Sequence, residues 1–442
     1  PWANSNYRLL NRTATNQKGT IDKSVLDEQS DPNHMGGFDF LLANDVDLSN
    51  PVVQAEQLIQ IHYLMNWGSI VMGDKDANFD GIRVDAVDNV NADMLQLYTN
   101  YFREYYGVNK SEAQALAHIS VLEAWSLNDN HYNDKTDGAA LAMENKQRLA
   151  LLFSLAKPIK ERTPAVSPLY NNTFNTTQRD FKTDWINKDG STAYNEDGTA
   201  KQSTIGKYNE KYGDASGNYV FIRAHDNNVQ DIIAEIIKKE INKKSDGFTI
   251  SDSEMKQAFE IYNKDMLSSN KKYTLNNIPA AYAVMLQNME TITRVYYGDL
   301  YTDDGHYMET KSPYHDTIVN LMKNRIKYVS GGQAQRSYWL PTDGKMDNSD
   351  VELYRTNEVY ASVRYGKDIM TADDTEGSKY SRTSGQVTLV VNNPKLTLHE
   401  SAKLNVEMGK IHANQKYRAL IVGTADGIKN FTSDADAIAA GY

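Results

Sequence analysis

The chain has 442 residues, 40% of them hydrophobic and 10% aromatic, which is enough for several hydrophobic cores in two or three domains. Its 47 Lys and Arg residues stand against 58 Asp and Glu residues, and the resulting net charge of −11 argues against a nucleic acid partner. The absence of cysteine excludes disulfides and cysteine-ligated metals, and no apolar run approaches the length of a membrane span.

The first part of the chain carries helix signals between short β-type runs. Asn50 followed by Pro51 predicts a helix that begins at position 51, and Gly68 is a good stop for it. Apolar residues then recur at helical spacing over 95–105, and Ser111 opens a possible capping box before the next helix. This alternation predicts an α/β fold.

The second part changes character twice. Between 183 and 218 polar and small residues crowd the chain, so we expect a surface insertion there. Aliphatic residues over 229–237 then predict the apolar stripe of a helix, within a helical insertion near 229–290. From 331 onward alternating runs predict an all-β domain. Its expected strands are 358–365, 386–391, 404–408 and 417–422.

Three short β-type runs end in a carboxylate. They are Gly81-Ile82-Arg83-Val84-Asp85, Ser120-Val121-Leu122-Glu123 and Phe221-Ile222-Arg223-Ala224-His225-Asp226. One carboxylate at a strand end is usually a helix cap or a surface charge, but three in this pattern indicate glycosyl-transfer chemistry. A (β/α)8 barrel places its catalytic groups at the C-terminal ends of its strands, which predicts one shared site.

The chemistry assigns roles to these carboxylates. Breaking an acetal with retention takes two carboxyl groups on opposite sides of one sugar. Asp85 suits the nucleophile, because Arg83 lies on the same strand face and keeps the carboxylate ionised. Glu123 suits the acid/base, because an apolar run precedes it and such surroundings raise a carboxyl pKa. Asp226 would stabilise the oxocarbenium-like transition state, with His225 donating to the same ring.

The chain resembles glycoside hydrolase family 70, the glucansucrases and related α-glucanotransferases of the α-amylase clan. The resemblance rests on the three motifs and on the segments 40–47, 50–57 and 294–299, and it extends along nearly the whole chain. It implies a circularly permuted (β/α)8 barrel and an all-β sandwich domain. The implied divisions are a loop-rich segment 1–50 with calcium-site residues, a barrel portion 51–330 and a C-type domain 331–442.

The barrel encoded here is expected to be incomplete. Eight βα units need on the order of 250 residues, and few residues precede Gly81. The resemblance implies that the first three barrel strands follow the β-domain, and the chain stops at Tyr442 before any such segment. Because the chain also opens on Pro1 without a signal-peptide pattern, we expect a segment of a longer, secreted bacterial protein. The missing C-terminal barrel segment would be its partner, in the same or a separate chain.

Carried over by position, the resemblance implies Asp85 as nucleophile, Glu123 as acid/base and Asp226 as transition-state stabiliser. The residues it implies at the donor glucose subsite are Arg83 and His225, and those near the acceptor side are Asn89, Trp125, Leu42, Asn227, Asn228 and Gln230. It also implies a calcium ion held by Asp39, Asp45 and Asn89, whose hard oxygen donors suit that ion.

Within the resemblance, Val87 and Trp125 favour sucrose as the donor, and the Asn227-Asn228 pair is similar to that of members that make α1→4 together with α1→6 bonds. We therefore expect a sucrose glucosyltransferase that acts on α-glucan or malto-oligosaccharide acceptors through a covalent β-glucosyl intermediate. Two alternatives remain. One is a 4,6- or 4,3-α-glucanotransferase that uses malto-oligosaccharides, and the other is a non-catalytic α-glucan-binding module.

Overall fold

The structure is a computed structural model. It describes residues 46, 48, 50–87, 90, 92–123, 141–143, 145–158, 169, 219–226, 229–247, 249–288, 292–302, 309–338, 359–391, 406–424 and 427–442. The chain divides into two compact units, with 1–146, 175–180 and 202–219 in unit 1 and 147–174, 181–201 and 220–442 in unit 2. Within the described part, no helix is both long and apolar enough to span a bilayer.

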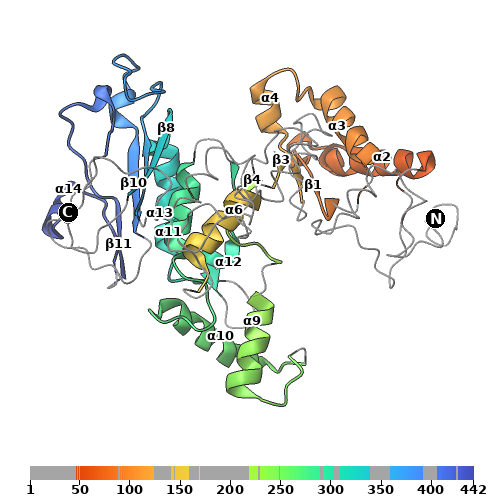
Figure 1. The fold of residues 1–442 in the computed structure, drawn as a ribbon. Coiled ribbons are helices and arrows are strands. Elements are labelled where there is room, and N and C mark those ends of the chain that lie inside the picture. The colour runs from red at the N-terminus through yellow and green to blue at the C-terminus, as the bar shows by residue number, and fades with distance from the viewer. Residues whose placement is uncertain are drawn as a thin grey trace, which may run out of the picture. The chain divides into compact units, whose positions relative to one another are not determined.

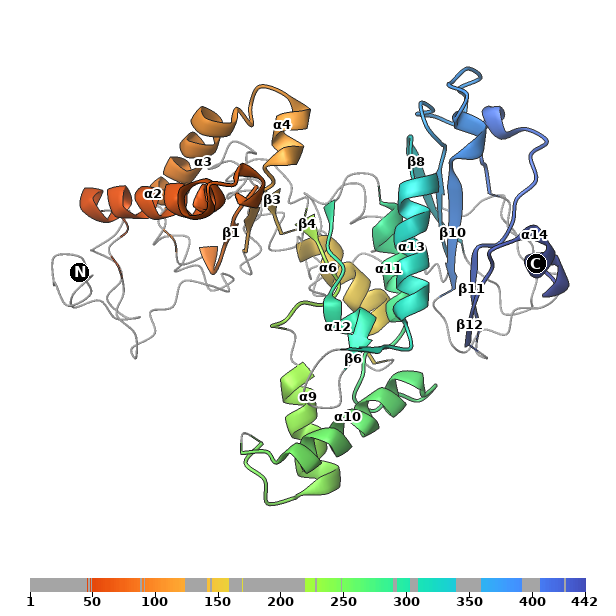
Figure 2. The same ribbon diagram turned by 180° about the vertical axis from the view of Figure 1, so that it is seen from behind.

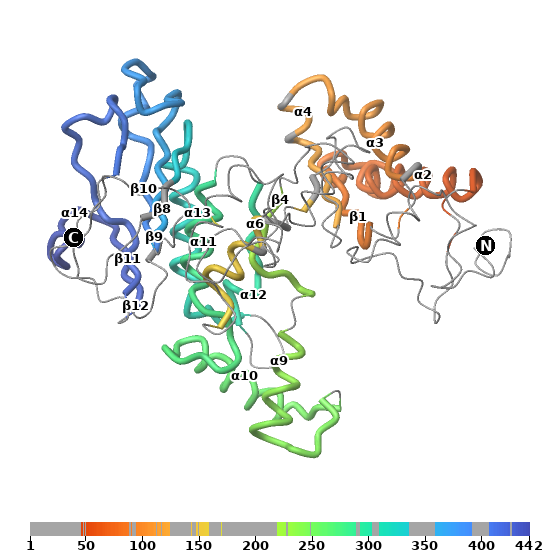
Figure 3. Tube along the Cα trace, viewed as in Figure 1, coloured from red at the N-terminus to blue at the C-terminus, as the bar shows by residue number. Residues whose placement is uncertain are grey.

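Unit 1 is built from helices and a small parallel sheet (Figure 1). Its helices are α2 (Pro51–Met65), α3 (Ala92–Tyr106) and α4 (Glu112–Ala117), and its strands are β1 (Arg83–Val84), β2 (Val121–Leu122) and β3 (Leu141–Ala142). The strands pair in parallel in the order β1-β2-β3. The tube in Figure 3 follows the chain from α2 through β1 to α3 and α4. Parallel strands joined by helices agree with the α/β class expected from the sequence.

Helix α2 begins where the sequence predicts and ends earlier. The Asn50 side chain accepts a 2.9 Å hydrogen bond from the Val52 amide and caps the helix. The helix ends at Met65, so the prediction of a stop at Gly68 is wrong. Gly68 instead opens a π-helical turn, and a Cβ there would lie 2.4 Å from the backbone of Ala77. A close approach of two backbones, rather than a helix end, requires this glycine.

Helix α3 confirms the helical spacing over 95–105, with one exception. Leu95 and Phe102 are buried, whereas Tyr105 is exposed and lies outside the apolar stripe. Ser111 caps α4 by accepting a 3.2 Å hydrogen bond from the Gln114 amide. In a full capping box the Gln114 side chain would accept a hydrogen bond from the Ser111 amide. Here it instead accepts a 3.3 Å hydrogen bond from the Ser111 hydroxyl.

Unit 2 contains the larger core, and α6 (Asn145–Leu151) and β4 (Tyr219–Val220) carry the chain into it. Its further helices are α9 (Val229–Ile236), α10 (Asp252–Leu267), α11 (Ile278–Gln287), α12 (Tyr297–Leu300), α13 (His315–Tyr328) and α14 (Asp434–Ala439). Its strands are β5 (Ile292–Thr293), β6 (Tyr301–Thr302), β7 (Thr310–Lys311), β8 (Gln333–Tyr338), β9 (Val359–Arg364), β10 (Gln386–Val391), β11 (Ile421–Thr424) and β12 (Gly427–Asn430). Short π-helical turns cover Leu152–Ala156 and Ile237–Ile241.

The C-terminal region holds an antiparallel sheet in the order β10-β9-β8 and the hairpin β11-β12. Helices α11 and α13 lie side by side next to the sheet (Figures 1 and 2), and Tyr282, Ile318 and Tyr360 belong to the shared core. The predicted strand 386–391 is confirmed, but 406–408 is not a strand and the run at 417–422 becomes one only at Ile421. Helix α14 also departs from the all-β expectation, because its Ser433 cap starts a helix after the last strand.

Helices α9 and α10 form a pair below the rest of unit 2 in Figure 2. The predicted stripe over 229–237 is confirmed, since Ile233, Ile236 and Ile237 are buried. A full capping box between Ser251 and Glu254 starts α10. The predicted insertion at 183–218 lies outside the described residues.

Asp265, buried in the last turn of α10, holds the loop that follows. Its carboxylate accepts hydrogen bonds of 2.8, 3.0 and 2.8 Å from the amides of Lys272, Tyr273 and Thr274, and a 2.9 Å bond from the Thr274 hydroxyl. Burial alone would raise the pKa of Asp265, but these hydrogen bonds outweigh it and lower the pKa. The ionised carboxylate therefore stabilises this loop.

We expect Asp265→Asn to destabilise the α9–α10 pair by about 2 kcal/mol at neutral pH, because the amide leaves donors without an acceptor. A pKa lowered by folding means that the stabilisation is present above the unfolded pKa of about 3.9 and is lost as the pH falls through the folded value. The difference in thermal midpoint between wild type and variant should therefore shrink from pH 7 to pH 3 in a calorimetric titration. An equal difference at both pH values would contradict a role for the ionised form.

Candidate active site

Asp85 and Glu123 follow adjacent parallel strands of unit 1. Arg83 pairs with Val121 and Val84 with Leu122, and the Glu123 amide donates a 3.0 Å hydrogen bond to the Val84 carbonyl. Parallel strands that end together bring their next residues to one edge of the sheet. The β-ladder therefore places the two carboxylates side by side.

The Arg83 guanidinium bridges the two carboxylates. Its Nη1 lies 2.5 Å from Asp85 Oδ1, and its Nη2 lies 2.5 Å from Glu123 Oε1. The contact between Arg83 and Asp85 is the one that strand alternation predicted. The Asp85 side chain is 71% exposed and that of Glu123 is 10% exposed, so the first carboxylate faces solvent and the second is largely enclosed.

The backbone after Asp85 is bent toward Glu123. Ala86 has a φ of 46°, a left-handed conformation that costs a residue with a Cβ about 1–2 kcal/mol. In this conformation the Ala86 amide donates a 3.0 Å hydrogen bond to Glu123 Oε2, and the Val87 amide donates a 3.0 Å bond to the Glu123 carbonyl. Two donors therefore fix the Glu123 carboxylate, one from Arg83 and one from the strained turn.

The charges of this cluster favour the protonated guanidinium. Burial alone would lower the pKa of Arg83, but the attraction of the Glu123 and Asp85 carboxylates outweighs it and raises the pKa. One fixed positive charge is thus shared by two acids.

Asp226 and His225 lie in unit 2, beyond a strand that is shorter than the sequence predicted. Strand β4 ends at Val220, and the residues from Phe221 to Ala224 continue outside a named strand but remain buried. His225 Nε2 lies 3.1 Å from Asp226 Oδ2, and the two side chains are 55% and 49% exposed. The pair thus follows a buried segment and faces solvent.

A second arginine, Arg223, is anchored inside unit 2. Its Nε donates a 2.9 Å hydrogen bond to Asp299 Oδ1, its Nη2 contacts the same oxygen, and its Nη1 donates a 2.9 Å bond to the Tyr262 hydroxyl. Tyr282 donates a 2.7 Å bond to Asp299 Oδ2. Burial alone would lower the pKa of Arg223, but Asp299 outweighs it and raises the pKa, while burial and Asp299 together raise the pKa of Tyr282. We call Arg223, Asp299, Tyr262 and Tyr282 the buried network.

Sequence reasoning did not assign roles to the buried network. Arg223 and Asp299 occur in the motifs quoted for the resemblance, but they are 76 positions apart and nothing local pairs them. The sequence indicates their pairing only in that each is a charged residue within an apolar run. A charged residue that is buried requires a partner.

Several predicted site residues lie outside the described part of the chain. They are Asp39, Asp45 and Asn89 of the calcium site, and Leu42, Trp125, Asn227 and Asn228 of the acceptor side. Gln230 is described and lies exposed in the first turn of α9. The described ranges contain no cluster of three or more His, Asp or Glu side chains fit to hold a metal.

The chain is similar to curated glucosyltransferases and to solved structures. A model of glycosyl hydrolase family 70 matches residues 1–441. Glucosyltransferase-S of Streptococcus mutans is 48% identical over 443 residues, which cover 99% of this chain and 28% of the relative. Glucosyltransferase-I of the same organism is 46% identical over 437 residues, covering 99% of this chain and 26% of the relative. The chain therefore spans under a third of the length of these relatives.

A truncated alternansucrase from Leuconostoc mesenteroides matches with a TM-score of 0.74 and 36% identity, over 97% of this chain and 35% of that one. An alternansucrase in complex with isomaltotriose matches with a TM-score of 0.72 and 36% identity, over 90% of this chain and 33% of that one. The family expected from the motifs is confirmed by these matches. The chain belongs to glycosyl hydrolase family 70.

Proposed function

We propose that this chain carries the catalytic carboxylates of a retaining sucrose glucosyltransferase that builds α-glucan. The observation that carries the proposal is the pair of carboxylates, Asp85 and Glu123, held by one guanidinium at the ends of adjacent parallel strands. Retaining glycosyl transfer needs two such groups at close range. The glucosyltransferase names of the relatives support the same reaction.

In the first step, Asp85 attacks C1 of the glucosyl group as the bond from C1 to the fructosyl oxygen breaks. Glu123 gives its proton to that oxygen, fructose leaves, and a β-glucosyl ester remains on Asp85. In the second step, Glu123 takes a proton from an acceptor hydroxyl, which attacks C1 and releases Asp85. Asp226 would stabilise the positive charge that develops on the ring in both steps, with His225 beside it.

The geometry in unit 1 supports this division of labour. Burial of Glu123, the enclosed member of the pair, favours its protonated form, whereas its contacts with Arg83 and the Ala86 amide favour its ionised form, as a group that gives and later takes a proton requires. Asp85 keeps the contact with Arg83 and faces solvent, as a nucleophile that must stay ionised requires. When Glu123 carries the proton, Arg83 and Asp85 form a neutral pair, so the cluster tolerates the change in charge.

For the acceptor we propose an α-glucan oligosaccharide. Support comes from the related alternansucrase, which has been solved in complex with isomaltotriose and with isomaltononaose. The residues we propose on the acceptor side are Asn89, Trp125, Leu42, Asn227, Asn228 and Gln230, and we propose mixed α1→4 and α1→6 linkages from the Asn227-Asn228 pair.

We further propose that unit 1 contributes to a (β/α)8 barrel completed by chain outside residues 1–442, and that the C-terminal sheet belongs to a sandwich. The parallel order β1-β2-β3 and the 35% share of the truncated alternansucrase that this chain covers support the proposal. We also propose that the activity lies outside the cell, as expected from the match to the family.

The donor is tested by incubating the protein at its full natural length with sucrose and, separately, with amylose. We expect fructose release from sucrose together with polymer, measured by chromatography of products. Turnover of amylose but not of sucrose would contradict the sucrose glucosyltransferase and indicate a 4,6- or 4,3-α-glucanotransferase. Silence on both donors, with retained binding of glucan, would point to a binding module.

The nucleophile is tested by Asp85→Asn, with Asp80→Asn as the matched control on the same approach to β1. We expect Asp85→Asn to lower kcat on sucrose by at least about 10,000-fold, because no covalent ester can form. Glucan binding measured by affinity electrophoresis should be retained. Activity near wild type in the Asp85 variant, or an equal loss in the exposed Asp80 control, would contradict the assignment.

We also propose that Asp39, Asp45 and Asn89 hold a calcium ion. Two carboxylates and an amide are the hard oxygen donors that calcium prefers, and when bound the ion would tie together the segments that carry them. Chelation should lower the thermal midpoint of wild type, and Asp45→Asn should lower the calcium content measured by mass spectrometry. Full calcium retention in that variant would exclude Asp45 as a ligand.

A further inference from the structure

We propose that the buried network of Arg223, Asp299, Tyr262 and Tyr282 positions His225 and Asp226 for glucosyl transfer. The proposal rests on the proposed function and assigns to Arg223 and Asp299 a positioning role. Neither residue is expected to touch the substrate, because the Arg223 and Asp299 side chains are only 5% and 0% exposed.

The buried network holds Arg223 from several directions. Asp299 Oδ1 accepts hydrogen bonds from Nε and Nη2 of Arg223, and Asp299 Oδ2 accepts one from the Tyr282 hydroxyl. The backbone of Asp299 is fixed as well, because its amide donates a 3.0 Å bond to the Tyr296 carbonyl and its carbonyl accepts a 2.5 Å bond from the Ser312 hydroxyl. A planar guanidinium gripped in this way has little freedom to turn.

The predicted site residues follow Arg223 closely in the chain. His225 lies two residues after Arg223, and Asp226 lies three residues after it. The buried Ala224 separates Arg223 from His225. The side chains of His225 and Asp226 are about half exposed and contact each other. The placement of this exposed pair therefore depends on the buried segment before it.

Packing of the apolar core alone does not require a charged residue at position 223. Phe221 and Ile222 already anchor the segment in the apolar core, and a buried ion pair often contributes no more stability than apolar residues of the same shape. A buried pair does, however, impose a direction and a fixed geometry on the groups that form it. Orientation of the residues that follow is the role that accounts for an arginine here.

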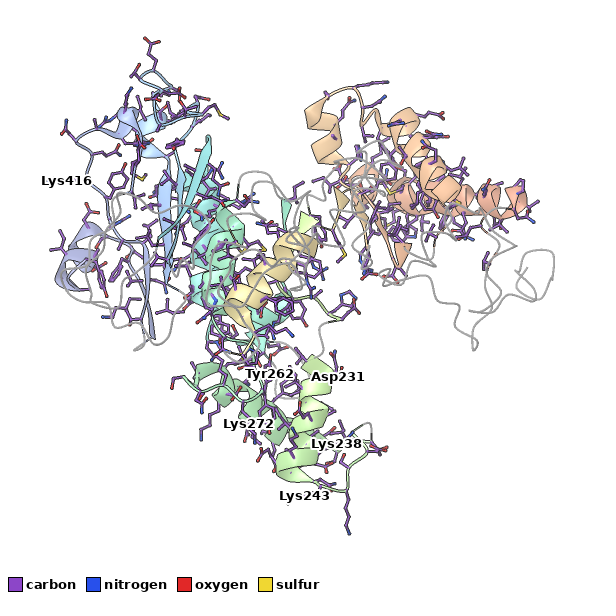
Figure 4. The ribbon with its side chains drawn as sticks, viewed as in Figure 1. Asp231, Lys238, Lys243, Tyr262, Lys272 and Lys416 are labelled. Carbon is purple, nitrogen blue, oxygen red and sulfur yellow. The ribbon has the colours of Figure 1, made fainter. Side chains whose placement is uncertain are left out.

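Tyr262 brings the helical pair α9–α10 into the network. It lies on α10, in the helical pair, and its hydroxyl is the acceptor for Arg223 Nη1. Figure 4 labels Tyr262 at the end of the pair nearest the remainder of unit 2, whereas Lys238 and Lys243 lie at the far end. The helical pair therefore contributes a group to the network, which links this insertion to the position of Asp226.

The test uses Asp299→Asn and Tyr262→Phe in the protein at its full natural length. Asp265→Asn is the matched control, because Asp265 is a second buried carboxylate, on the same helix as Tyr262, and it holds the 272–274 loop instead of Arg223. Kinetics are measured at a temperature at which calorimetry shows every variant folded. Hydrogen exchange of the peptide that covers 219–226 is followed by mass spectrometry.

We expect Asp299→Asn to lower kcat on sucrose by about 100-fold, the loss that accompanies a misplacement of about 1 Å, with little change in KM. Tyr262→Phe, which removes a single hydroxyl and preserves the fold, should lower kcat by about 5-fold. Both should speed exchange at 219–226. Asp265→Asn should lower the thermal midpoint and leave kcat and exchange at 219–226 as in wild type.

Wild-type kcat in Asp299→Asn, or losses of kcat that follow the thermal midpoint equally in all three variants, would overturn the positioning role. If wild type itself does not turn sucrose over, the proposed function fails and the exchange data still decide the network. Faster exchange at 219–226 in Asp299→Asn but not in Asp265→Asn would support the positioning role, and unchanged exchange in both would reject it.

Discussion

One guanidinium shared by two carboxylates is the interaction on which the site in unit 1 depends. Arg83 neutralises half of the charge that Asp85 and Glu123 would otherwise place at one sheet edge. Because the guanidinium contacts both side chains, its charge offsets the repulsion between the two carboxylates. The parallel ladder between β1 and β2 holds the three groups together, and the left-handed turn at Ala86 adds a backbone donor to the acid.

The second arginine uses the same chemistry in a different environment. Arg83 is partly exposed and bridges Asp85 and Glu123, whereas Arg223 is enclosed and meets Asp299 away from solvent. Exposure leaves the first ion pair able to rearrange as a proton moves, and burial makes the second pair rigid. The two motifs therefore look alike in sequence, with an arginine shortly before the acid, but their arginines lie in different environments.

Helix α10 is joined to the rest of unit 2 by two buried polar side chains. Tyr262 and Asp265 are three positions apart on one helix face, both buried, and both hold polar partners. The tyrosine meets Arg223 of the motif segment, and the carboxylate closes the loop that leads to α11. Local capping at Ser251 starts the helix, and these two contacts determine where its end lies.

The family and the elements with strong local signals could be predicted from the sequence. Asn50 with Pro51 predicts the start of α2, the stripe over 229–237 predicts α9, and alternation predicts β10, because capping and periodicity act within a few residues. Residues 406–408, the described part of the run predicted at 404–408, are not a strand, because alternation alone does not make a β-ladder. The proximity of Asp85 and Glu123 follows from strand pairing, and the meeting of Arg223 with Asp299 from the packing of segments 76 positions apart. These contacts could not be predicted from local sequence, because the free energy that pairs two buried charges depends on their desolvation and their distance in the folded chain.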